Sequence, residues 1–412
     1  YISKMDAKVG ELLKELEENG LAEDTIVFYY SDHGGVLPRS KRFLYESGTK
    51  IPLIIRFPQK YQHLTSKQPG SREDRLVSLV DLAPTMFSLL NITIPVHFSG
   101  HAFLGNQTSA EPAYVHFFRQ RMDERYDMMR AVRDKEFRYI RNYMPHRKYG
   151  QHLWYLWRSP ATRVWETAFK QGKCNTVQSR FWREKEPEEL YHIKTDPHNV
   201  NNLANDPQYH NVLERMRKET SRWVRVSRDA GFLPEGLMIE LAGDKTVYEI
   251  THSSHFPMEK IIETAEMASS KNIKYLSTLI KRLSHTQATI RYWAATGCAI
   301  LGNKAKPAVP ELTLLLKDPF ADVRITAAEA LCTMGPKKES LDLLVQEMRN
   351  ENPWVQLHAP NVLSALGNDP KMVIKDIMSL TPWGLKTDDY FHQAYIQLLK
   401  ELKPGWGDYV IW

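Results

Sequence analysis

A repeated helical pattern in the C-terminal part of the chain constrains the fold most strongly. Three segments, IRYWAATGCAILG, VRITAAEALCTMG and VQLHAPNVLSALG, align on glycines 302, 335 and 367, which are 33 and 32 residues apart. The turn pairs Asp318-Pro319 and Asn352-Pro353 recur 34 residues apart. Small residues inside amphipathic helices at such a period are typical of stacked helix pairs, each burying its face against the next. An irregular helical bundle is the alternative.

The middle segment, VRITAAEALCTMG, resembles HEAT-like repeats. The resemblance implies an all-α repeat domain over residues 257–412, which would pack against the rest of the protein or bind a protein partner, since stacked helix pairs offer extended surfaces. The composition changes after GFLPEG, so we expect a linker at 236–256 and a first domain at 1–235.

The first domain carries the alternating patterns of an α/β fold. An amphipathic helix in residues 1–20 precedes TIVFYY, a strand rich in β-branched and aromatic residues. IPLIIRF is a second, nearly all-apolar strand, of the kind buried on both faces of a parallel or mixed sheet. DLAPTMFSLLNI then predicts a short helix. Further on, AYVHFF, MMRAVRD, FRYIRNY and EELYHI predict a small antiparallel sheet, covered by a helix at about 208–230.

Charge and hydropathy exclude two classes of partner. The net charge of +6 comes from 55 basic and 49 acidic residues, without a run of five like charges, so we expect no nucleic-acid partner. No apolar stretch approaches the ~20 residues that span a bilayer, which predicts no membrane span. Cys174, Cys298 and Cys332 lie too far apart for a disulfide framework or a paired zinc site.

The segment SDHGGVLPRSK places candidate metal-binding and anion-binding residues directly after the first strand. In open α/β sheets, ligands bind at the carboxyl ends of strands, where Asp32 and His33 stand. Oxygen ligands suit a hard cation such as calcium, and an imidazole can complete a mixed site. Lys41 adds a point cation for an anionic oxygen, so metal and lysine could hold a sulfuryl or phosphoryl group. The alternatives are an ordinary turn and a solvated lysine.

Four motifs together resemble the second half of type I sulfatases. They are TIVFYYSDHGG, RSKRFLYESGTKIPLIIRFP, VSLVDLAPTMFSLLNITIP and EELYHIKTDPHNVNNLANDP. The resemblance covers about residues 1–230 and is nearest to bacterial relatives of heparan N-sulfatase and iduronate sulfatase. It implies part of an alkaline-phosphatase-like α/β fold with a small C-terminal antiparallel sheet.

The resemblance also assigns roles to single residues. Asp32 and His33 would be the later pair of calcium ligands, and Lys41 would be the catalytic lysine that binds the sulfate group and its bridging oxygen. Glu46 and Gly48 would fill a structural Tyr-Glu-x-Gly turn. The implied activity is hydrolysis of a sulfuric ester on a sulfated carbohydrate, in a periplasmic or extracellular protein.

Other parts of a sulfatase site are not in this sequence. The formylglycine nucleophile of the family arises from Cys or Ser in a C/S-x-P/A-x-R motif, and an early Asp-Asp pair completes the calcium site. None of the three cysteines has the following Pro and Arg, SPATR at 159–163 offers Ser and Arg but has its Pro one place too early, and no early Asp-Asp pair is found. We therefore expect the later part of a longer protein, inactive alone. A phosphodiesterase or phosphonate hydrolase of the same superfamily, and a non-catalytic chain whose repeats bind a partner, are the alternatives.

Two further features could contact a sugar. Arg121, in HFFRQRMDERYDMMR, could bind an anionic sugar, although a solvated charged loop explains the same mixture of charges. The aromatic cluster Trp154, Tyr155, Trp157 and Trp165 could form a sugar-stacking wall or pack in a core.

Overall fold

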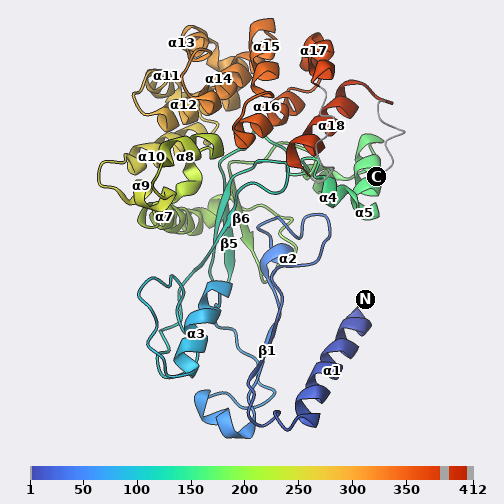
Figure 1. The fold of residues 1–412 in the computed structure, drawn as a ribbon, viewed down its shortest axis with the longest axis vertical. Helices are drawn as coiled ribbons and strands as arrows, with labels where there is room; N and C mark the ends of the chain where they lie inside the picture. The colour runs from blue at the N-terminus through green and yellow to red at the C-terminus, as the bar shows by residue number, and fades with distance from the viewer. Residues whose placement is uncertain (1, 381–388, 406–412) are drawn as a thin grey trace.

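The computed structural model describes residues 2–380 and 389–405, so the last part of the expected repeat domain, 381–388 and 406–412, lies outside the described residues. Three regions follow one another along the long axis (Figure 1). The N-terminal region lies at one end, a four-stranded sheet lies in the middle, and the helical repeats stack at the other end.

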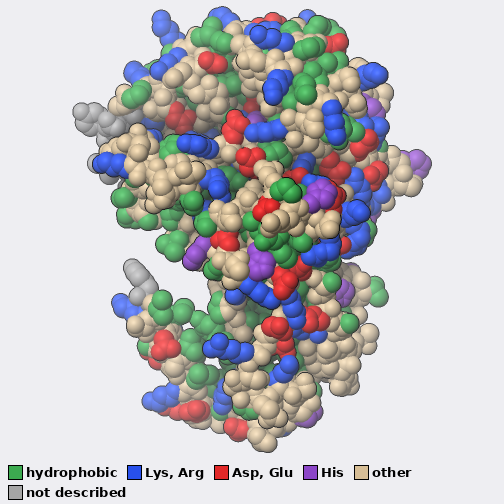
Figure 2. Space-filling view, turned by 180° about the vertical axis from the view of Figure 1, so that it is seen from behind, with side chains coloured by type: hydrophobic (Ala, Val, Ile, Leu, Met, Phe, Trp, Pro, Cys, Tyr) green, Lys and Arg blue, Asp and Glu red, His purple; other side chains and the backbone are tan. Residues whose placement is uncertain are grey.

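The surface mixes charges of both signs. Figure 2 shows Lys and Arg side chains interspersed with Asp and Glu on this face, and a narrow waist between the N-terminal region and the rest. Within the described residues, no helix combines the length and the apolar character needed to cross a bilayer.

The N-terminal region contains the helix, strand, strand and helix that the sequence predicts. Its elements are α1 (Ile2–Glu18), β1 (Val27–Tyr30), α2 (Glu46–Thr49), β2 (Leu53–Arg56) and α3 (Leu82–Leu89). The surroundings of β2 differ from the expectation of a strand buried on both faces. β1 and β2 pair antiparallel as a two-stranded sheet, with Tyr30 opposite Leu53. Because no other strand flanks this pair in the described part of the chain, Ile54 is 61% exposed.

The predicted antiparallel sheet is confirmed. It runs in the order β3-β4-β5-β6, and helix α7 packs on one face; the elements are β3 (Val115–Arg119), β4 (Met129–Arg133), β5 (Phe137–Asn142), β6 (Glu188–His192) and α7 (His210–Val226). Side chains alternate across a strand. Val132 therefore packs with Met216 of α7, whereas Ala131 faces the opposite core with Leu44 and Tyr45.

Three short helices between β5 and β6 carry the aromatic cluster. They are α4 (Trp154–Trp157), α5 (Pro160–Lys170) and α6 (Thr176–Arg180). Trp165 stacks on Phe181 with ring centroids 4.8 Å apart, and Trp157 meets Trp182 edge-on at 6.0 Å. Core packing thus explains these two tryptophans.

The predicted repeat domain is a stack of helices. Its helices are α10 (Met258–Ala268), α11 (Leu276–Arg282), α12 (Ala288–Leu301), α13 (Val309–Leu315), α14 (Ala321–Thr333), α15 (Lys338–Glu347), α16 (Pro353–Ala365), α17 (Ile374–Ser379) and α18 (Tyr390–Leu402), and they are preceded by α8 (Glu235–Ala242) and α9 (Val247–His252). The periodic glycines 302, 335 and 367 follow α12, α14 and α16 with φ of 55°, 134° and 68°. Helices commonly end on a residue with positive φ, and glycine adopts this conformation without a Cβ clash.

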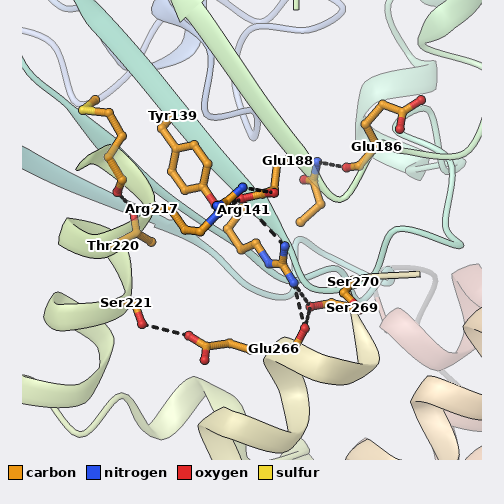
Figure 3. A network of polar contacts seen from close by, with 12 residues as sticks. Tyr139, Arg141, Glu186, Glu188, Arg217, Thr220, Ser221, Glu266, Ser269 and Ser270 are labelled. Carbon is orange, nitrogen blue, oxygen red and sulfur yellow. Dashed lines mark hydrogen bonds and ion pairs between the residues drawn. The ribbon is translucent and has the colours of Figure 1, made fainter. Parts of the chain in front are cut away.

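The sheet and the repeats share one core. Tyr143 and Phe232 pack against Trp293 of α12, whose indole nitrogen donates to the Phe232 carbonyl at 2.8 Å. In Figure 3, Arg141 of β5 donates to Ser269 Oγ (2.7 Å) and to the Glu266 carbonyl (2.9 Å) at the end of α10. The segment 236–256, expected to be a linker, contains most of α8 and all of α9, and α8 packs on α14 and α16.

Candidate active site

Asp32 and His33 follow the end of β1, which runs within the N-terminal region toward α2, on the side of the central sheet (Figure 1). The Asp32 side chain is 80% exposed, and its Oδ2 lies 3.2 Å from His33 Nε2. His33 Nδ1 lies 2.6 Å from the Gly34 carbonyl, which can only accept, so Nδ1 carries the proton. In the neutral ring, Nε2 then turns a lone pair toward the carboxylate. A cation is one partner that satisfies both groups, and an imidazole that donates to a backbone carbonyl is typical of metal ligands.

Gly34 lets this turn contact α2. Its amide donates to the Gly48 carbonyl at 3.0 Å. A Cβ atom on Gly34 would lie 1.8 Å from the Ser47 carbonyl oxygen, and one on Gly48 would lie 2.3 Å from the carbonyl oxygens of Ser40 and Phe43. Both positions therefore require glycine. The close approach holds the turn that carries Asp32 and His33 against the Tyr-Glu-x-Gly turn.

Lys41 lies on the same loop as the acid and the imidazole. Its amide donates to the Gly35 carbonyl at 3.2 Å, which closes the segment between them. The flanking residues Arg39 and Arg42 have φ of 61° and 78°, a conformation unusual outside glycine that clusters at functional sites. Lys41 Nζ lies 5.2 Å from the ring centroid of Tyr155, so this member of the aromatic cluster borders the lysine.

Asn199, which the sequence reasoning missed, ties this loop to the central sheet. The Glu46 amide donates to Asn199 Oδ1 at 2.7 Å, and the Arg39 guanidinium donates to the Asn199 carbonyl at 2.9 Å. Asn199 is buried and has a φ of 52°, which asparagine tolerates better than most residues. The motif DPHNVNNL indicated that this segment matters, but the motif does not show that Asn199 contacts Glu46 and Arg39.

Glu46 has the structural role that the resemblance implies. Its carboxylate accepts from Arg133 at 2.9 Å and from Arg138 at 2.5 Å. Burial acts to raise the pKa of Glu46, but the two guanidinium groups outweigh burial and hold the pKa below its usual value. The carboxylate thus joins α2 to β4 and β5.

The Arg121 side chain contacts the repeat region. Its guanidinium forms an ion pair with Glu235 of α8 and lies 5.4 Å from the ring centroid of Trp354 on α16. Only 9% of the side chain is exposed. Its role toward a substrate stays a prediction, and an anionic ligand would have to displace Glu235.

Two family models match the chain. Residues 1–92 match the model described as Sulfatase, and residues 309–399 match HEAT repeats. The N-terminal part of the chain is thus similar to sulfatases. It is 43% identical over 239 residues to an ulvan-active sulfatase of Formosa agariphila, an alignment covering 58% of the chain and 39% of that protein.

Two more relatives carry sulfatase names. Human N-sulphoglucosamine sulphohydrolase is 28% identical over 255 residues, covering 58% of the chain and 49% of that protein. An N-acetylglucosamine-6-O-sulfatase of Bacteroides thetaiotaomicron is 30% identical over 151 residues, covering 34% of the chain and 26% of that protein. The chain therefore spans less than half the length of these relatives. A solved putative sulfatase from Bacteroides thetaiotaomicron aligns with a TM-score of 0.38 at 22% identity, covering 55% of this chain and 41% of that one.

Asp32 and His33 could supply part of a metal site. Among the residues that the structure describes, no group of three His, Cys, Asp or Glu side chains is placed to hold a metal alone. Calcium takes 6–8 ligands, chiefly oxygens, so the Asp32 carboxylate could supply only part of its shell, with His33 Nε2 as a less usual nitrogen ligand. The sulfatase family in general uses a metal and a formylglycine. In the printed sequence only Ser159-Pro160-Ala161-Thr162-Arg163 has the spacing of the C/S-x-P/A-x-R motif, with Ala in the third place, and Ser159 is the N-cap residue of α5.

Proposed function

We propose that this chain belongs to a sulfatase that hydrolyses a sulfuric ester on a sulfated carbohydrate, and that it supplies Asp32, His33 and Lys41 to the active site. The observation that carries the proposal is the loop 31–42. An acid and an imidazole lie 3.2 Å apart there, on the same hydrogen-bonded loop as a lysine. The relatedness to enzymes named as sulfatases favours sulfate over other tetrahedral anions.

Each of these residues has a distinct role in the proposed reaction. Asp32 and His33 Nε2 would hold calcium, which neutralises charge on the sulfate oxygens when bound, while a formylglycine outside this sequence supplies the nucleophile. Lys41 would donate hydrogen bonds to the sulfate group and to the bridging oxygen. Negative charge grows on that oxygen as the S–O bond breaks, so a fixed ammonium lowers the barrier to hydrolysis.

The substrate class follows from the relatives. Their names specify ulvan, N-sulphoglucosamine and N-acetylglucosamine 6-sulfate as sulfated substrates, all of them carbohydrates. We propose the same class here, and a periplasmic or extracellular location. We also propose a sulfatase domain portion at 1–235, a connecting segment at 236–256 and a repeat domain at 257–412.

The test is an assay of the full-length protein. Release of inorganic sulfate from sulfated polysaccharides and monosaccharides is measured with calcium and after chelation, beside phosphodiester and phosphonate substrates. We expect calcium-dependent sulfate release and a C/S-x-P/A-x-R motif in the remainder of the gene. Preferential cleavage of phosphodiesters would favour the related hydrolases instead, and a gene without the motif would contradict the proposal.

A further inference from the structure

The turn 122–125 connects the repeats with the loop that carries Lys41. It is closed by hydrogen bonds between Met122 and Arg125, at 3.0 and 3.1 Å. Asp123 at its tip forms an ion pair with Arg42, the neighbour of Lys41. The side chain of Arg42 is only 6% exposed. The ion pair therefore holds a buried guanidinium next to Lys41, the lysine proposed to bind sulfate.

The same turn holds the aromatic ring beside Lys41. The carboxylate of Glu124 accepts from the Trp154 amide at 2.5 Å, in the first turn of α4. The next residue, Tyr155, lies under both cations, with Arg42 Cζ 4.7 Å and Lys41 Nζ 5.2 Å from its ring centroid. Burial raises the pKa of Glu124. The turn therefore determines the position of two of the side chains that border Lys41.

A repeat helix holds the turn from the other side. Asn361, on α16, donates from Nδ2 to the Glu124 carbonyl at 2.9 Å. Its Oδ1 accepts from Arg125 at 3.2 Å, and Arg125 also donates to the His152 carbonyl at 2.9 Å. One amide side chain thus contacts the turn twice, and Arg125 is buried in this contact.

We infer that Asn361 is a positioning residue for the Lys41 loop, so that the repeat domain forms part of the sulfatase active-site support. The effect on turnover rests on the proposed function, whereas the mechanical coupling does not. The path runs from Asn361 through the turn 122–125 to Arg42 and Tyr155. The effects of mutations are coupled when the residues belong to one hydrogen-bond and ion-pair network, whereas the effects of mutations at independent sites add.

The experiment compares Asn361→Ala with Asn352→Ala in the full-length protein. Asn352 caps the same helix, accepting from the Trp354 amide at 3.1 Å, but contacts Gly236 rather than the turn. Hydrogen–deuterium exchange of residues 35–42 should be at least about threefold faster in Asn361→Ala and unchanged in Asn352→Ala. The kcat/KM for a sulfate ester should fall about fivefold only in Asn361→Ala, the size of one lost coupling.

A double variant separates positioning from general destabilisation. In an Asp123→Ala background, Asn361→Ala should lower kcat/KM by clearly less than it does alone, because the branch through Arg42 is already cut and only the branch through Glu124 and Tyr155 remains. Equal effects of the two asparagine variants, a full additional loss in the Asp123→Ala background, or unchanged exchange of residues 35–42 would each overturn the inference. A full-length protein that releases no sulfate would refute the proposed function instead, and the exchange measurement would still decide the role of Asn361.

Discussion

The amide of Glu46 and the side chain of Asn199 lie 2.7 Å apart and join segments separated by 153 residues. Asn199→Ala removes this acceptor and leaves a buried amide unpaired, which typically costs about 1–3 kcal/mol. We expect the free energy of unfolding, measured with urea, to fall by that amount. Asn201→Ala, at an exposed position of the same motif, is the control and should change it by less than about 0.5 kcal/mol. Equal stabilities of the two variants would contradict the role of Asn199.

The carboxylate of Glu46 should be far more sensitive than a surface carboxylate. Glu46→Gln leaves Arg133 and Arg138 without their anion, and breaking a buried pair typically costs about 3–5 kcal/mol. Glu136→Gln removes an exposed pair with Lys194, where the expected loss is about 0–1 kcal/mol. Denaturant unfolding of both variants measures the difference. A small loss for Glu46→Gln would show that this network does not hold α2 on the sheet.

The contact between the sheet region and the repeats should weaken in acid. Glu329 of α14 accepts from Arg147 at 2.5 Å and lies 3.6 Å from His146. Burial lowers the pKa of His146 below 6.5, so the unfolded chain binds its proton first and stability is lost as pH falls from about 6.5 through the folded value. Burial acts to raise the pKa of Glu329, but Arg147 and His146 lower it well below 4.5, so this contribution is present above about 4.5 and lost at lower pH.

Thermal unfolding between pH 7 and pH 3 measures this dependence. His146→Gln should flatten the upper part of the curve, below about pH 6.5, and Glu329→Gln the lower part, below about pH 4.5. His63→Gln, at an exposed position, should leave the curve unchanged. Curves of the same shape for all three variants would exclude this contact as the acid-sensitive element.

Local sequence patterns predicted most of the architecture. The glycines at 302, 335 and 367 recur because each ends a repeat helix at positive φ, a requirement that the residue itself reveals. The strands of the central sheet were predicted because alternating β-branched and aromatic residues follow the period of a strand. The surroundings of β2 could not be predicted, because an apolar run indicates a preference for burial without naming the layer that provides it.

The polar contacts of the candidate site could not be predicted from the sequence. The mixed charges of MDERYD fit a solvated loop, yet Glu124, Arg125 and Asp127 are all buried, with partners that come from distant segments. Asn361 lies more than 200 positions from Arg125, and nothing local to either residue predicts their contact. The residues Asp32, His33 and Lys41 were selected by type and motif, and the structure adds the backbone hydrogen bonds of the loop that carries them.

Calcium binding should depend on Asp32. Asp32→Asn removes one anionic oxygen ligand, and we expect calorimetric titration of the full-length protein to show an affinity for calcium at least about tenfold weaker, a loss of about 1.4 kcal/mol. Asp6→Asn, on exposed α1, is the matched control and should bind as the unmodified protein does. Unchanged affinity in Asp32→Asn would remove Asp32 from the metal site.

The kcat/KM of the Lys41→Ala variant of the full-length protein, on a sulfated saccharide, tests the central claim most directly. Loss of one donor to the developing charge typically costs 10²–10³-fold, so we expect a decrease of about 10²-fold or more. Lys50→Ala, an exposed lysine just after α2, should retain nearly full activity. A Lys41→Ala enzyme as active as Lys50→Ala would contradict the assignment of this loop to the sulfate pocket.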